Sequence, residues 1–273
     1  MTTNHETLIR LMVFAAVLTA MAWWEAVAPR RLRSYSRAKR WPANLAIATL
    51  GTVVVRFAMP LGALGFASFC TTHGWGLLNI IPLPRAIAVI GAVIALDFAI
   101  YLQHVMFHAL PVLWRIHRMH HTDLDLDVTS GVRFHPVESV ISMAIKLAAI
   151  AALGPPVAGV LAFEVLLNAS SLFNHSNVAI APANDALMRL LICTPDMHRV
   201  HHSIVVRETN SNFGFNLPWW DRLFGTYCSE PAAGQIGMTI GIEQFREADE
   251  LGFIRMMIQP WREASREYPG NRA

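Results

Sequence analysis

Histidine carries the clearest chemical signal in this sequence. Ten of its twelve histidines fall between residues 104 and 202. Eight of the ten stand in three motifs, in which residues three or four apart share one face of a helix. These motifs are H-x-x-x-H at His104 and His108, H-x-x-H-H at His117, His120 and His121, and H-x-x-H-H at His198, His201 and His202. Because neutral imidazole binds iron, zinc, copper and nickel strongly, the pattern predicts a metal site.

Eight histidines are more than one metal ion can bind. A coordination shell holds about four to six ligands, so two ions a few ångströms apart are the simplest arrangement that uses them all. Two further histidines stand alone. His175 follows an apolar segment, and His135, in the sequence RFHPVE, is expected either to bind metal or to fix its loop. The spacing by itself leaves the identity of the metal open.

Four polar side chains are candidates to orient the metal-binding histidines by accepting their second ring N–H. They are Asp97, Glu164, Asn168 and Asp196. The first shares a helical stripe with the H-x-x-x-H motif, and the next two share a stripe with His175. Alternatively, Asp97 can pair with Arg56, Glu164 can cap a helical hairpin, and Asp196 can cap its own helix. The alternating acids of segment 123–127 are expected to face solvent or to line a substrate entrance.

The composition is that of a membrane protein. Hydrophobic residues make up 54% of the chain and charged residues 15%, against averages of about 45–50% and about 25%. The mean hydropathy is +0.38. The net charge of +3 is small and the basic residues are concentrated in one segment, which argues against nucleic acid binding. Three widely spaced cysteines make neither a disulfide framework nor a metal-binding pair.

Four apolar segments are long enough to cross a bilayer, which needs about 20 residues. They are 8–28, 43–70, 85–110 and 137–173, and the last is divided by a Gly-Pro-Pro break at 154–156 that is typical of a helical hairpin. Six cations between Arg30 and Arg40 place that loop in the cytoplasm by the positive-inside rule. The N-terminus then lies outside, and all the histidine groups come to the cytoplasmic face.

We therefore predict an all-α fold, a multi-pass transmembrane helical bundle with a cytoplasmic histidine-rich metal-binding cap. Residues 1–40 are expected to form a first transmembrane helix and a basic cytoplasmic loop. The first apolar run is expected to stay as an anchor, because it is long and is followed by the basic loop. Residues 41–230 are expected to form the membrane domain that carries the histidines, and residues 231–273 an amphipathic cytoplasmic tail on the membrane surface.

In their order and spacing the motifs resemble the fatty acid hydroxylase / sterol desaturase superfamily of membrane oxygenases. The resemblance extends to FHP at 134–136, TPDMHRVHH at 194–202 and WDRLFGTY at 220–227, and it covers roughly residues 40–230. It implies a non-haem centre of two iron ions that uses O₂ to hydroxylate a fatty acyl chain, a sterol or a related lipid. Desaturation of the lipid is the alternative within the superfamily. Acyl-lipid desaturases usually separate the first two motifs by more than the eight residues found here.

The same resemblance implies which residues bind iron and which partners the protein needs. The implied ligands are His104, His108, His117, His120, His121, His175, His198, His201 and His202, with His135 as a further candidate. No side chain is implied as a general base. Nothing in the sequence could be a fused cytochrome b5 domain, so an external electron donor or reductase is expected beside the lipid substrate.

Two other classes of protein also use clustered histidines. A histidine-rich membrane metal transporter would place them along a path through the membrane, whereas the predicted topology gathers them at one face. A bis-histidine haem protein needs only two histidines for each haem and would leave most of this set unexplained. Both alternatives are therefore less consistent with the sequence than an oxygenase.

Overall fold

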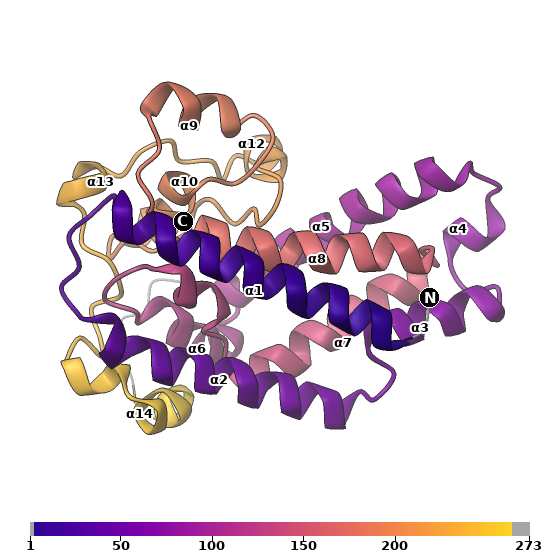
Figure 1. The fold of residues 1–273 in the computed structure, drawn as a ribbon, viewed down its shortest axis with the longest axis horizontal. Helices are drawn as coiled ribbons and strands as arrows, with labels where there is room; N and C mark the ends of the chain where they lie inside the picture. Colours follow the sequence, from indigo (N-terminus) through magenta and orange to yellow (C-terminus); the bar gives the residue numbers. More distant parts are fainter. Residues whose placement is uncertain (1–2, 264–273) are drawn as a thin grey trace.

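The computed structural model describes residues 3–263, and this part of the chain is built from helices (Figure 1). Strand-like pairing among these residues is limited to two isolated bridges. Five helical segments are long and apolar enough to cross a membrane. They are α1 (Thr3–Val27), the run of α2, α3 and α4 over Arg37–Ile80, α5 (Arg85–Ala109), α7 (Pro136–Leu153) and α8 (Val157–Asn174). The prediction of an all-α, multi-pass bundle is confirmed.

The long helices extend along the long axis of the molecule and pack against one another (Figure 1). Helix α1 packs on α8, α2 packs on α7, and α5 contacts both α7 and α8. Small and apolar side chains fill the space between them, including Ala63, Ala67, Leu96, Ile150 and Phe163. The outward faces carry exposed leucine, isoleucine and phenylalanine side chains, which suits surfaces that contact lipid.

The second apolar segment is broken, although the sequence predicted one continuous segment over 43–70. Helix α2 (Arg37–Ala58) ends before Pro60, and α3 (Gly62–Thr72) begins after it. Proline has no N–H to donate and drives the preceding residue out of the α conformation, so that Met59 has φ −136° and ψ 73°. Gly62 then turns the chain with a φ of +59°. The short helix α4 (Leu77–Ile80) follows.

The predicted helical hairpin is confirmed. Helix α7 ends at Gly154, which adopts the left-handed conformation with φ 60° and ψ 46°. Pro156 stands directly before α8. The tip of the hairpin packs tightly on the turn between α3 and α4, since a Cβ atom added to Gly76 would lie 2.1 Å from the backbone nitrogen of Gly154.

Short helices form a cap at the opposite end of the bundle (Figure 1). They are α6 (Pro111–His121), η1 (Val128–Val132), α9 (Pro182–Met188), α10 (Pro195–His201), α11 (Val206–Thr209), α12 (Trp219–Phe224), α13 (Gly234–Gly237), η2 (Ala248–Leu251), α14 (Phe253–Ile258) and η3 (Gln259–Trp261). The last of these helices fold back onto the rest of the protein: α14 contacts α2, and η3 contacts α6. The part of the predicted tail over 264–273 lies outside the described residues.

The basic segment after α1 is bound to the cap. Arg40 is fully buried and forms ion pairs with Asp123 at 2.6 Å and Asp127 at 2.5 Å. Arg30 pairs with Asp196 at 2.9 Å. The acids of segment 123–127 are thus largely buried and paired, and the expectation that they face solvent is wrong. The structure places the basic segment and the histidines at the same end of the bundle.

Candidate metal centre

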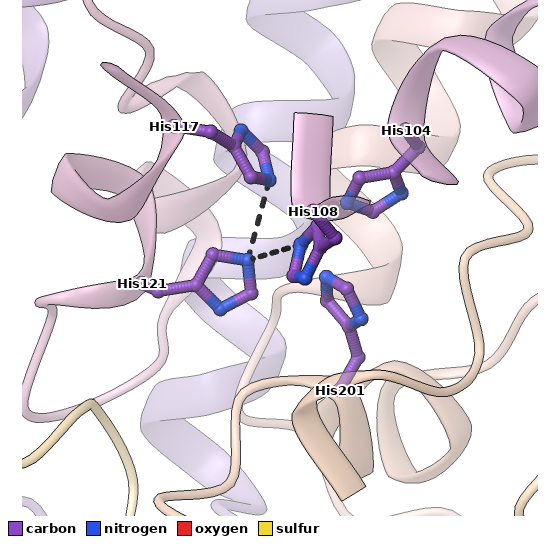
Figure 2. Close-up of side chains that lie close together, drawn as sticks. All are labelled: His104, His108, His117, His121 and His201. Atoms are coloured by element: carbon purple, nitrogen blue, oxygen red, sulfur yellow. Dashed lines mark hydrogen bonds between the residues drawn. The ribbon is translucent and has the colours of Figure 1, made fainter. Parts of the chain in front are cut away.

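Nine histidines from four helices and their ends meet in two buried groups where the bundle joins the cap. The first group contains His104 and His108 of α5, His117 and His121 of α6, and His201 of α10 (Figure 2). The second group contains His120, His175, His198 and His202. Within each group the candidate ligand nitrogens lie within 4.8 Å of one another. None of the nine residues is more than 6% exposed.

The distances between ring nitrogens fit ligands of a shared ion. In the first group, Nε2 of His121 lies 3.1 Å from Nε2 of His108 and 3.2 Å from Nε2 of His117 (Figure 2). In the second group, Nε2 of His175 lies 3.0 Å from that of His120 and 3.1 Å from that of His198. Two nitrogens bound at right angles, each about 2.1 Å from one ion, are themselves about 3 Å apart. A cation between them also removes the repulsion of facing lone pairs.

The other nitrogen of most rings is held by the protein. Five Nδ1 atoms face oxygen acceptors, which are Phe213 O for His104, Asn210 Oδ1 for His108, Arg133 O for His120, Ser171 O for His175 and Ser211 O for His201. An Nδ1–H donated in this way fixes the tautomer and directs the Nε2 lone pair into the cluster. Nε2 of His104 and of His201 has no hydrogen-bond partner among the described residues, as expected of a metal ligand.

Burial favours the neutral, metal-binding state of several of these histidines. It lowers the pKa of His175 to about 4 and that of His201 to about 3. The pKa of His121 and that of His202 also fall well below the ordinary value, first through burial and then through neighbouring imidazoles. Neutral rings of this kind can accept a cation, and among the described residues neither group includes a carboxylate.

Glu138 is a functional residue that the sequence reasoning missed. Its Oε1 lies 2.7 Å from Nδ1 of His117, and the carboxylate is almost completely buried. Glu138 stands in the first turn of α7, and α6 and α7 are in contact. The signal was available in RFHPVE, where this acid follows His135 by three residues and begins an apolar helix. Glu138 thus orients a clustered histidine by direct contact.

His135 lies outside both groups. Its Nδ1 accepts a hydrogen bond from the N–H of Val137 and so caps α7, while its Nε2 lies 3.2 Å from the carbonyl oxygen of Met257. Both ring nitrogens therefore have backbone partners. Of the two roles considered for this residue, the geometry matches the fixing of the loop.

Asp97 acts on the histidines through the backbone. It accepts hydrogen bonds from the side-chain nitrogen of Asn216 and the indole of Trp220, both at 2.8 Å. Asp221 in turn accepts the N–H groups of Phe213 and Gly214, each at 2.8 Å. These bonds shape the segment that offers its carbonyl oxygen to His104. The predicted direct contact between Asp97 and a histidine is thus replaced by an indirect one. The alternative pairing of Asp97 with Arg56 is not formed, because Arg56 donates to the carbonyl oxygen of Pro60.

The other three orienting candidates also have partners other than a histidine among residues 3–263. Glu164 pairs with Lys146 of the neighbouring hairpin helix at 2.9 Å and with Arg10 of α1 at 3.0 Å. Asn168 donates to the carbonyl oxygen of Glu164. Asp196 pairs with Arg30 and with Arg199. These contacts join helices and hold α10 in place.

Comparison with known proteins agrees with this geometry. The pattern of the fatty acid hydroxylase family matches residues 89–226, which include all nine clustered histidines, and the chain belongs to this family. The chain is 30% identical over 186 residues to ornithine lipid hydroxylase OlsE of Rhizobium tropici, an alignment covering 67% of this chain and 53% of OlsE. It is therefore a member of a lipid-modifying hydroxylase and monooxygenase family with metal-binding histidines.

Alkylglycerol monooxygenases are also similar to this chain. The human protein (Homo sapiens) is 29% identical over 155 residues, which cover 56% of this chain and 34% of the relative. The Xenopus tropicalis protein is 28% identical over 152 residues, covering 56% and 33%. The chain thus spans about half the length of OlsE and a third of the alkylglycerol monooxygenases. No solved structure matches it.

Proposed function

We propose that this protein is an O₂-dependent di-iron hydroxylase of a membrane lipid. The observation that carries the proposal is the convergence of nine buried histidines, in groups of five and four, at the end of apolar helices. In this proposal all nine bind iron, His135 caps α7, and Glu138 positions His117. The chemistry supplied by bound iron is activation of O₂ and insertion of one oxygen atom into a C–H bond.

Aromatic side chains exclude water from the proposed reaction site. Phe134 stacks on His120 with ring centroids 4.5 Å apart, and Phe213 lies 5.1 Å from His108. Phe215 lies 6.3 Å from His198 and continues into the apolar cluster between α3, α5, α7 and α8. An apolar wall next to the histidines suits a hydrocarbon chain and protects an oxidant from water.

The relatives suggest the substrate. Because OlsE is named for the hydroxylation of ornithine lipid, an amino acid–containing acyl lipid is the first candidate. An alkylglycerol ether lipid is the second candidate, suggested by the alkylglycerol monooxygenases. In both cases the lipid enters from the bilayer. Electrons are needed because the second oxygen atom of O₂ is reduced to water, and in this proposal they come from a separate donor. We place the histidine site on the cytoplasmic face by the six cations between Arg30 and Arg40.

The test combines metal analysis with a lipid assay. Protein purified without oxygen and reconstituted with reductant is supplied with O₂ and either ornithine lipid or a 1-O-alkylglycerol. We expect close to two iron ions per chain, O₂ uptake, and a lipid product that has gained one oxygen atom. His201→Ala should abolish O₂ uptake and product. An active preparation without iron, or a transport of metal across vesicles without lipid oxidation, would refute the proposal.

A further inference from the structure

An exposed apolar surface lies on the cap, outside the five candidate membrane spans. We call it the α9–α12 face. It consists of Leu187, Leu190, Leu191, Ile192, Trp219, Leu223 and Phe224, which are between 38% and 69% exposed. The two segments form one surface, because the indole of Trp219 donates to the carbonyl oxygen of Leu190 at 2.7 Å. Arg222 also donates to the carbonyl oxygen of Arg189 at 2.8 Å.

The charged side chains of these two segments are buried, with the exception of Arg222. Asp185 and Arg189 are the charged residues of α9 and the turn after it, and both are buried and paired with each other at 2.6 Å. Arg222 is exposed but lies over the ring of Tyr227, 4.4 Å from its centroid. The arrangement of an apolar surface with tryptophan, tyrosine and arginine at its edge is typical of a membrane–water interface.

The depth of the α9–α12 face is set by its contact with α5. Phe98 lies 4.7 Å from Trp220 and 5.8 Å from Phe224, measured between ring centroids, and Tyr101 lies 5.6 Å from Phe224. Phe98 stands eleven residues before Ala109, the last residue of α5, which is about 16 Å along the helix axis. A hydrocarbon core of about 30 Å takes up about 20 residues of α5 counted from Arg85. The last five residues of α5 then lie beyond the core, on the side of the cap, and Phe98 lies roughly 10 Å inside the core boundary on that side.

We propose that the α9–α12 face is a membrane-docking surface that lies in the acyl–headgroup boundary of the same bilayer that α5 crosses. Helices that lie in an interface bury their apolar side about 5–10 Å deep, which matches the level of the contact with Phe98. The surface is continuous with the lipid-facing side of α5 through Phe98 and the exposed Leu102. Docking would hold the segment 210–217, which bonds to His104, His108 and His201, at a fixed height above the bilayer.

The experiment measures where spin labels on this face lie. Leu191→Cys and Leu223→Cys are made separately in a Cys228→Ser background, because Cys228 is partly exposed whereas the other two cysteines are buried. The labelled protein is reconstituted in vesicles of phosphatidylcholine and phosphatidylglycerol. Accessibility to O₂, which concentrates in lipid, is compared with accessibility to a water-soluble nickel chelate.

Two matched apolar positions serve as references. Ile90 of α5 is 60% exposed and represents lipid. Ile236 is 63% exposed and represents water, because its helix, α13, lies at the far end of the cap (Figure 1). We expect the O₂-to-chelate ratio at positions 191 and 223 to approach that at position 90 and to exceed that at position 236 several-fold. A ratio equal to that at position 236 would overturn the proposal. Protection from both reagents with spin–spin broadening would also overturn it, since a second copy would then cover the face. The readout needs neither metal nor activity and is independent of the proposed function.

Discussion

At the scale of single residues, the contact between Glu138 and His117 is the clearest device for setting a ligand. The carboxylate and Nδ1 are 2.7 Å apart, and both groups are buried. A carboxylate at this distance fixes the orientation of the imidazole through a side chain, whereas backbone carbonyl oxygens fix the orientation of four of the other rings. His117 is therefore distinguished from its neighbours by its partner.

We expect Glu138→Gln to weaken metal binding by about 10–100-fold, the usual effect of removing such a partner. The amide keeps the shape of the side chain and removes its charge. The measurement is the chelator concentration that removes half of the iron. Glu243→Gln, at an exposed carboxylate, is the control and should leave this concentration unchanged. Equal iron retention in both variants would show that Glu138 has no role in holding His117.

His135 provides the opposite test. His135→Asn keeps an acceptor for the N–H of Val137, so that the cap of α7 is retained. Because His135 lies outside both histidine groups, we expect the iron content per chain to equal that of the parent protein. His120→Asn should lose iron, because His120 belongs to the second group. Loss of one iron ion from His135→Asn would mean that it is a ligand after all.

At the scale of elements, the close approach of η1 to α8 supports the second histidine group. Gly131 lies so near α8 that an added Cβ would be 2.3 Å from the carbonyl oxygen of Ser171. The hydroxyl of Ser171 donates to the carbonyl oxygen of Gly131, and its own carbonyl oxygen holds Nδ1 of His175 at 2.8 Å. The glycine therefore keeps η1 close to the end of α8, and the residue after η1, Arg133, holds Nδ1 of His120 through its carbonyl oxygen.

We expect Gly131→Ala to lower the free energy of unfolding by about 1–3 kcal/mol, the usual cost of overpacking. The added methyl group meets backbone, which cannot move aside as a flexible side chain would. Gly91→Ala is the matched control, because an added Cβ there has no neighbour within 4 Å and a helical alanine stabilises by about 0.5–1 kcal/mol. The measurement is the thermal midpoint of the reconstituted protein. A midpoint of Gly131→Ala at or above that of the parent would contradict this account.

At the scale of the whole molecule, the burial of the histidines links stability to pH. In the unfolded chain a histidine titrates near its ordinary pKa of about 6.5. In the folded protein burial lowers the pKa of His175 to about 4 and that of His201 to about 3. Between these values the unfolded chain binds more protons than the folded protein, so stability falls as the pH falls.

We expect metal-stripped protein to be most stable above about pH 6.5 and to lose stability steadily as the pH is lowered toward 4. The measurement is the thermal midpoint of the stripped protein from pH 7.5 to pH 4. Added metal should raise the midpoint most at the upper end of this range, because metal competes with protons for the same nitrogens. A midpoint independent of pH would mean that the rings are not buried in the neutral state.

Prediction from sequence succeeded where a local pattern has a local cause. Histidine spacing on helices, the length of apolar segments and the Gly-Pro-Pro break each constrain a short stretch of chain, and the structure agrees with them. It failed where the partner is far away in the chain. The acidic loop predicts that Asp123 faces solvent, but Asp123 is buried against Arg40, which is 83 residues away in the chain. Asp97 bonds to Asn216, 119 residues away. Charge and stripe position alone cannot select such partners.

The sequence by itself determined the residue types and their spacing, and thereby the membrane helices and the family of the protein. The tertiary structure decided how nine histidines divide into groups of five and four, and which acid orients a ring. His117, His120 and His121 lie on one short helix, yet His120 joins the second group and its two neighbours join the first. The physical reason is that the division depends on how α5, α8 and α10 pack around α6, and no spacing within one helix encodes that packing.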